Sequence, residues 1–176
     1  MFVSSYLTIC LVNNLSHRDL VVGLIKCGSK QTAIISAYMD IKAKPVTDHL
    51  QAAIHYCKSR GYSILLTADT NSQCKIWGNE TNTRGKKWEE LIETEHLLVH
   101  NQGRIPTFES KIGKSIIDVT LSYRLPYTLD NWRVLRSYNG TDHNTIHYSL
   151  KGMEIEIPAH RLYHKANWPP PHFKWT

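Results

Sequence analysis

The chain of 176 residues is long enough for one domain with a short tail and too short for two ordinary domains. Hydrophobic residues make up 41% of it and charged residues 20%, which excludes a collagen-like, coiled-coil or disordered chain. The formal net charge of +6 favours a polyanionic partner only weakly, and no apolar run approaches the roughly 20 residues that span a membrane.

Three strands are predicted in the first part of the chain, over residues 6–12, 19–26 and 32–38. Gly28 and its small polar neighbours favour a hairpin turn between the second and third, so we expect an antiparallel meander. The first segment lacks basic residues and a small-residue cleavage site, and we interpret it as a strand rather than a signal peptide.

The four cysteines are widely spaced and include no C-x-x-C pair. This spacing favours reduced thiols in an intracellular protein over a disulfide framework or a zinc site.

The middle of the chain alternates helical and strand patterns. A first helix is predicted from a cap at Thr47 or Asp48 to Gly61, because apolar residues recur at intervals of three and four. The apolar run 62–68 is typical of a strand buried on both faces. Residues 69–82 are polar and rich in turn formers, and a second helix is predicted over 83–96.

Four further strands are predicted over residues 97–99, 115–122, 131–136 and 144–150, with Pro126 in the turn before the third. The composition then changes to a tail with four prolines and several aromatic residues. We therefore expect a domain over 1–150, a linker or tail over 151–176, and a layered α/β (α+β) sandwich. Neither a Rossmann nor a P-loop glycine motif is present.

Candidate chemistry begins at Asp69 and Asn71, which directly follow the most apolar predicted strand. Their spacing of two places both side chains on one face, where a carboxylate and an amide can hold a hard cation or orient a water. The alternative is a loop in which Asp69 only caps a turn.

Three other polar groups are set among strand residues. Asp118 lies among apolar residues, where an unpaired charge is costly, so it either has a partner or faces water at a sheet edge. Asp142 and His143 are adjacent and should point apart in an extended chain, one toward a metal and the other toward a substrate. The hydroxyl of Tyr38 could donate to a phosphate, although such a tyrosine is more often a half-buried strand residue.

Eight short motifs occur in order along residues 19–150: S-A-Y at 36–38, A-D-T-N at 68–71, W-G at 77–78, N-x-R-G at 82–85, P-T-F at 106–108, S-I-I-D-V-T at 115–120, W-R-V at 132–134 and T-D-H at 141–143. On these motifs the chain resembles the endonuclease/exonuclease/phosphatase superfamily, and within it the endonuclease domain of non-LTR (LINE-type) retrotransposons. The segment 161–168, R-L-Y-H-K-A-N-W, also resembles the linker into a reverse transcriptase.

The resemblance implies a DNase I-like fold of two mainly antiparallel sheets flanked by helices. It also implies Mg²⁺-dependent (or Mn²⁺-dependent) hydrolysis of a phosphodiester, here a nick in DNA that primes reverse transcription. A reverse transcriptase domain is then expected downstream in an intact relative, although this chain contains none, and access to DNA implies the nucleus.

The resemblance also implies the role of each matched residue. Asp69 would orient or deprotonate the attacking water, and Asn71 would hold that water and a phosphoryl oxygen. His143 would bind the scissile phosphate, positioned by Asp118, while Asp142 would serve the metal. The contacts to phosphate would come from Tyr38, Asn71, Lys111 and Lys114, although Lys111 and Lys114 could equally belong to a solvated loop.

The sequence departs from the family at its start. The family's first strand–helix–strand unit, which carries the main metal-ligating Glu, has no counterpart here, and Glu80 is the first Glu in the chain. A site without that Glu should bind Mg²⁺ poorly. Gln73 stands where the family often has His.

Two alternative functions follow. One is a catalytically inactive remnant with weak nucleic-acid binding. The other is an enzyme for phosphomonoesters or lipid phosphodiesters, which the Trp77–Gly78 and Asn82–Gly85 motifs oppose.

Overall fold

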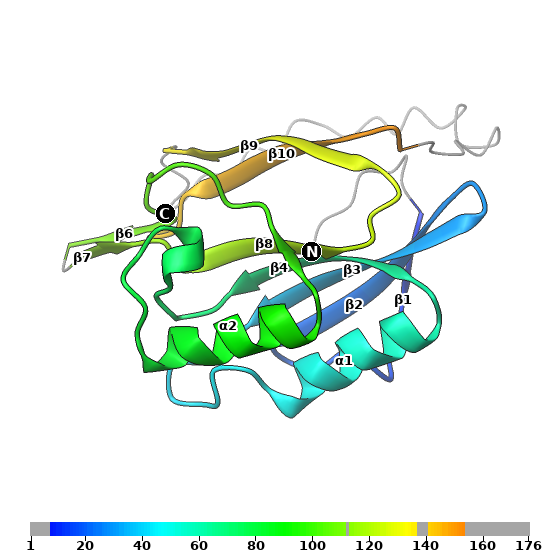
Figure 1. The fold of residues 1–176 in the computed structure, drawn as a ribbon, viewed down its shortest axis with the longest axis horizontal. Coiled ribbons are helices and arrows are strands. Elements are labelled where there is room, and N and C mark those ends of the chain that lie inside the picture. The colour runs from blue at the N-terminus through cyan, green and yellow to red at the C-terminus, as the bar shows by residue number, and fades with distance from the viewer. Residues whose placement is uncertain (1–7, 112, 137–140, 154–176) are drawn as a thin grey trace, which may run out of the picture.

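A computed structural model describes residues 8–111, 113–136 and 141–153. A six-stranded sheet in the order β1-β2-β3-β4-β8-β5 carries two helices on one face, and the pair β9-β10 lies over the other (Figure 1). A hairpin of β6 and β7 extends from one end. The elements are β1 (Ile9–Leu11), β2 (Leu20–Cys27), β3 (Lys30–Tyr38), α1 (Asp48–Ser59), β4 (Ser63–Asp69), the 3₁₀ turn η1 (Lys75–Trp77), α2 (Thr83–Thr94), β5 (Leu98–Val99), β6 (Phe108–Ser110), β7 (Gly113–Ser115), β8 (Asp118–Tyr123), β9 (Thr128–Leu135) and β10 (Thr145–Lys151).

The first three strands form the predicted antiparallel meander, with Val22 opposite Ile35 in β2 and β3. Helix α1 then crosses over the sheet, so that β4 runs parallel to β3. The hydroxyl of Thr47 caps α1 by accepting from the amide of Leu50 at 3.2 Å. The helix buries its apolar stripe against the sheet, through Leu50, Ala53, Ile54 and Cys57.

Strand β4 is central and carries the first candidate residue at its end. Most of its residues are buried, as expected from the apolar run, and β8 pairs with it in antiparallel register. Register places Tyr38 beside Asp69 and Asp69 beside Asp118. Three neighbouring strands therefore bring these side chains to one end of the sheet.

The pair β9-β10 and the large sheet form a sandwich of two sheets, with the helices on its outer side. The indole of Trp132 in β9 is 4% exposed and donates to the hydroxyl of Thr120 in β8 at 3.0 Å. This bond satisfies two buried polar groups at once and fixes the second layer on the first.

The predicted strand 115–122 is wrong in its first half. Ser115 ends β7, and β8 begins only at Asp118. Residues 116 and 117, between β7 and β8, do not pair in a sheet because side chains bind their backbone groups. Trp77 donates to the carbonyl of Ile116 at 3.1 Å, and Thr107 accepts from the amide of Ile117 at 3.0 Å.

Other predicted ends shift by a few residues. Helix α2 ends at Thr94 rather than at His96, because His96 adopts a left-handed φ of 50°. Strand β10 continues to Lys151, and most of the predicted tail, 154–176, lies outside the described residues. None of the described helices is long and apolar enough to cross a membrane.

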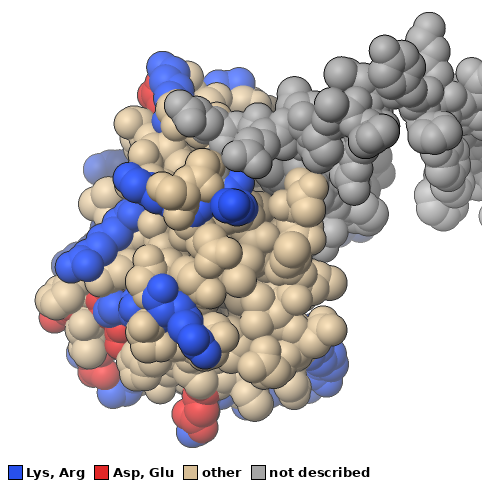
Figure 2. Space-filling view, turned by 90° about the vertical axis from the view of Figure 1, so that its right-hand side faces the viewer, with Lys and Arg blue, Asp and Glu red and all other residues tan. Residues whose placement is uncertain are grey.

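The basic residues gather unevenly on this fold. Figure 2 views the end of the sheet where β4 begins, and Lys and Arg side chains cluster on this face, with Asp and Glu mainly toward its lower edge.

Candidate active site

His143 joins the two carboxylates at the end of the sheet. Its Nδ1 lies 3.0 Å and 3.2 Å from the two carboxylate oxygens of Asp118, and its Nε2 lies 3.8 Å from Oδ2 of Asp69. The ring packs edge-on against Phe108, with centroids 5.1 Å apart. A bond at Nδ1 fixes the ring and leaves Nε2 directed toward Asp69.

Thr107 fixes both Asp118 and the segment that carries His143. It is fully buried, and its Oγ1 accepts from the amides of Ile117 and Asp118, both at 3.0 Å. Its carbonyl accepts from the amide of Asn144 at 2.7 Å. Thr107 lies in the P-T-F motif at 106–108, but no pattern in the sequence predicts this role for it.

The loop after β4 holds Asn71 in a constrained conformation. Asn71 has a φ of 45°, which is uncommon for a residue other than glycine but tolerated by Asn. Its amide donates to Oδ1 of Asp69 at 3.1 Å, and its side chain donates to the carbonyl of Met39 at 3.1 Å. Asn71 thus lies beside Asp69 and bridges to the end of β3.

The start of α2 supports that loop, and this explains the N-x-R-G motif. Asn82 caps the helix by accepting from the amide of Gly85 at 2.7 Å. Arg84 donates to the carbonyl of Asn71 at 3.1 Å and to three carbonyls after β3. A Cβ on Gly85 would lie 1.9 Å from the carbonyl oxygen of Gln73, so only glycine permits this contact.

The electrostatics single out Asp69. Burial, and after it the neighbouring charge of Asp118, raise the pKa of Asp69 above its ordinary value of 3.8. The amide of Asn71 and the ring of His143 oppose this shift. A carboxylate with a raised pKa is a better proton acceptor at neutral pH, and a cation beside it would relieve the repulsion.

These residues also form a candidate cation site. One ligand atom each from Asp69, Asp118 and His143 lie within 4.8 Å of one another, the one such group among the described residues. Two carboxylates suit Mg²⁺ or Mn²⁺, which prefer oxygen ligands and keep several waters. The donor set therefore fits such an ion.

Asp142 lies apart from this group. It is exposed, and its backbone carbonyl accepts from the amide of Glu109 at 2.7 Å. Its role as a metal ligand stays a prediction.

The predicted phosphate contacts have different surroundings. Tyr38 is 44% exposed and lies next to Asp69 across the parallel strands. Lys111 is exposed at the tip of the β6-β7 hairpin, whereas Lys114 pairs with Glu109 at 3.0 Å. Tyr38 is thus adjacent to the site, while both lysines lie on the hairpin at its side.

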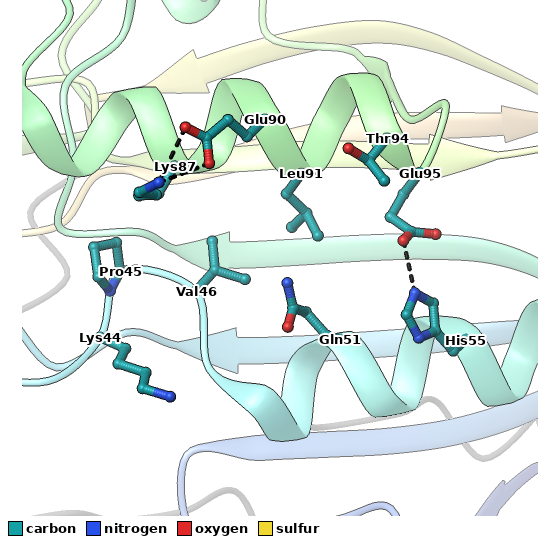
Figure 3. A pocket seen from close by; sticks show the side chains of 10 residues that line it. All are labelled: Lys44, Pro45, Val46, Gln51, His55, Lys87, Glu90, Leu91, Thr94 and Glu95. Carbon is teal, nitrogen blue, oxygen red and sulfur yellow. Dashed lines mark hydrogen bonds and ion pairs between the residues drawn. The ribbon is translucent and has the colours of Figure 1, made fainter.

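Two hollows differ in their relation to this site. One of about 340 Å³ lies between the large sheet and β10, and Asp69 and Asp118 line it together with Tyr148. The other, of about 540 Å³, lies between α1 and α2, where His55 binds Glu95 (Figure 3). The first hollow adjoins the candidate catalytic groups, and the second belongs to the helical layer.

Comparison with known proteins decides the family. A family model described as endonuclease-reverse transcriptase matches residues 32–147, a range that contains Asp69, Asp118 and His143. The chain belongs to this family. A search among curated proteins found no match.

Solved structures confirm the fold of this endonuclease-reverse transcriptase family member. The endonuclease domain of TRAS1, a telomere-specific non-LTR retrotransposon, superposes with a TM-score of 0.73 at 23% identity, covering 84% of this chain and 70% of that one. An endonuclease/exonuclease/phosphatase family protein from Leptotrichia buccalis gives 0.54 at 14% identity, covering 82% of this chain and 60% of that one. The chain thus spans less than two thirds of the second structure.

The same fold also occurs in a protein of another kind. A Cimex nitrophorin mutant, solved as its ferrous NO complex, gives a TM-score of 0.53 at 14% identity, covering 80% of this chain and 62% of that one. Fold alone therefore does not assign an activity, which has to be argued from the site residues.

Proposed function

We propose that this protein is a metal-dependent DNA endonuclease that nicks one strand, as the endonuclease part of a reverse-transcriptase polyprotein. The observation that carries the proposal is the group of Asp69, Asp118 and His143 within 4.8 Å at the end of the sheet. Family membership supports a nuclease-type function, and the candidate cation site supports metal dependence.

Asp69 takes a proton from the attacking water, since burial and Asp118 raise its pKa. Asn71, held beside it, orients that water and a phosphoryl oxygen. The water oxygen bonds to phosphorus, the bond to the 3′ oxygen breaks, and that oxygen takes a proton from solvent. A bound Mg²⁺ or Mn²⁺ supplies positive charge for the developing anion.

His143 acts on the phosphate itself. Asp118 accepts from Nδ1 and fixes the ring, so that Nε2 can face a phosphoryl oxygen and stabilise the charge that accumulates there. We assign Asp142 to the metal and Tyr38, Lys111 and Lys114 to the DNA backbone. The expected nuclear location and downstream reverse transcriptase belong to the same proposal.

Nicking of supercoiled plasmid by the purified chain tests the proposal. We expect nicking with Mg²⁺ or Mn²⁺ and none with EDTA. His143→Ala should lower the rate about 100-fold or more, since it removes the imidazole that faces the phosphate. His147→Ala is the matched control, because His147 lies four residues on and is exposed on β10.

Two outcomes would overturn the proposal. Nicking that survives EDTA, or that both His143→Ala and His147→Ala leave unchanged, would not come from this metal-dependent site. A folded chain that never nicks above the His143→Ala background would be the inactive remnant.

A further inference from the structure

The end of the molecule opposite the candidate active site has features of its own. Three turns meet where β4 begins: the β2-β3 hairpin, the α1-β4 turn and the segment after β8. Strand β4 separates this end from Asp69, and its seven residues span about 20 Å. Any ligand here is therefore remote from the catalytic groups.

A hollow of about 650 Å³ opens between these three turns. Four cations line it: Lys26, Lys30, Arg60 and Arg124. None of the described residues that line it is acidic, and Figure 2 faces this end of the molecule, where Lys and Arg cluster. A cleft lined by one sign of charge concentrates ions of the other sign.

The four cations lack carboxylate partners. Within the described residues none of them takes part in an ion pair, whereas Lys44, Lys87 and Lys151 elsewhere on the surface each do. Gathering unpaired like charges around one hollow is unfavourable for the free protein. Repulsion of this kind is expected at a site where a bound partner of opposite charge offsets it.

Both arginines stack on aromatic rings. The guanidinium of Arg60 lies 5.3 Å from the ring centroid of Tyr56, and that of Arg124 lies 5.2 Å from that of Tyr123. Stacking restrains the planar group through its face and leaves its N–H edge available to an anion. Arg60 lies at the C-terminal end of α1, where the helix dipole favours a cation. The dipole explains the charge at Arg60 but not at the other three cations.

The backbone at Arg124 is also unusual. Its φ of 46° lies in the left-handed region, which a long side chain seldom occupies. The hydroxyl of Ser63 donates to its carbonyl at 2.7 Å and holds the turn in place. Arg124 is thus fixed at the hollow although a glycine or asparagine would suit this backbone better.

We propose that this hollow binds the phosphate backbone of a single-stranded nucleic acid. Phosphates fit a cluster of unpaired lysines and arginines, and the half-buried ring of Tyr62 in the lining offers a surface on which a base can stack. Among the described residues that line it, the other apolar side chains are those of Leu125 and Pro126, too few for insertion into a lipid surface.

This site goes beyond the proposed nicking activity and does not depend on it. A rigid duplex held at Asp69 does not bend around the molecule to the far end of β4, so the hollow takes a separate strand or a distant single-stranded segment. Its binding requires no divalent metal.

Fluorescence anisotropy with a labelled oligothymidylate of about 20 nucleotides, in EDTA, tests the proposal. The pocket variant carries Lys26→Gln, Lys30→Gln, Arg60→Gln and Arg124→Asn. We expect its Kd to rise about tenfold or more, and the slope of log K against log salt to fall by roughly 3, close to 0.7 for each lost phosphate contact.

The control variant removes the same charge from exposed lysines elsewhere: Lys44→Gln, Lys75→Gln, Lys86→Gln and Lys87→Gln. It should change the Kd by less than about threefold, as expected when only the long-range field is altered. Circular dichroism and thermal melting must show both variants folded. The double variants Lys26→Gln/Lys30→Gln and Arg60→Gln/Arg124→Asn should each give part of the loss.

Equal weakening in the pocket and control variants would overturn the proposal, because the attraction would then be a general effect of charge. So would a pocket variant that keeps oligonucleotide binding but loses binding to phosphatidylserine vesicles, which would assign the hollow to a membrane.

Discussion

Two cysteines show how burial controls a single residue's chemistry. Cys57 and Cys74 are fully buried, and burial raises the pKa of each thiol to about 11. At pH 8 about one thiol in a thousand is then ionised, and only the thiolate reacts. Cys10 is exposed.

Alkylation with iodoacetamide at pH 8, followed by mass spectrometry, checks this difference. The native protein should be modified at Cys10 and spared at Cys57 and Cys74, whereas all three should react in denaturant. Rapid native modification of Cys74 would contradict its burial, with Sγ bonded to Glu89 of α2 at 3.1 Å.

Glu95 is a buried charge whose partners determine a pH dependence. It is 5% exposed and lies 2.7 Å from Nζ of Lys58. It also lies 2.7 Å from Nε2 of His55, as Figure 3 shows. Burial opposes its ionisation, but the bonds from Lys58 and His55 outweigh burial and hold the pKa of Glu95 below its ordinary value of 4.5. Its charge therefore stabilises the fold above the unfolded pKa, and this contribution is lost as pH falls through the lower folded pKa.

Urea denaturation at several pH values tests this. At pH 7, Glu95→Gln should lower the free energy of unfolding by about 1–2 kcal/mol, since a charged hydrogen-bond acceptor is replaced by a neutral one. The difference from the native protein should shrink as pH falls below 4.5. Glu93→Gln, at an exposed position two residues before Glu95, should have little effect at any pH. A pH-independent difference would refute the role of the charge.

At the scale of elements, the start of α2 supports the loop after β4 that carries Asn71. Gly85→Ala would place a Cβ against the carbonyl of Gln73, which is backbone and cannot turn away. We expect a loss of about 1–3 kcal/mol in stability, because the loop after β4 must move. Thermal unfolding measures it. Gly113→Ala, where a Cβ meets no atom, is the control and should change stability by less than about 0.5 kcal/mol.

Elements specified by nearby residues were predictable from the sequence. The Thr47 cap and the three-and-four spacing after it identified α1, and the apolar run identified β4. The β6-β7 hairpin was missed because its short strands, Phe108–Ser110 and Gly113–Ser115, lack an apolar alternation. Its existence depends on bonds that Thr107 makes to residues far along the chain.

At the scale of the whole molecule, the candidate site depends on strand register. Asp69, Asp118 and His143 were each identified as candidates from local context, and the resemblance to the family grouped them. Their distances follow from β4 pairing with β8 and from the 2.7 Å bond between Asn144 and Thr107. The roles of Arg84 and Thr107 could not be predicted, because their partners are backbone groups and no side-chain pattern in the sequence indicates such bonds.

The wide sequence separation of these three residues also determines when the site can exist during synthesis. Asp69 emerges about 70 residues before His143, an interval of several seconds at ordinary translation rates of about 5–20 residues per second. During it, the face of the sheet that β9-β10 will cover stays open, and Thr120 still lacks the indole of Trp132.

Pulse-labelled hydrogen exchange on the refolding chain reports the same order. Amides within α1 should gain protection first, because their partners are local, and the amide of Asn144 last, because its partner is Thr107. Simultaneous protection would contradict this order. A nascent chain that has not reached His143 thus holds two adjacent carboxylates without their imidazole, so any nicking activity can begin only after the last strand is in place.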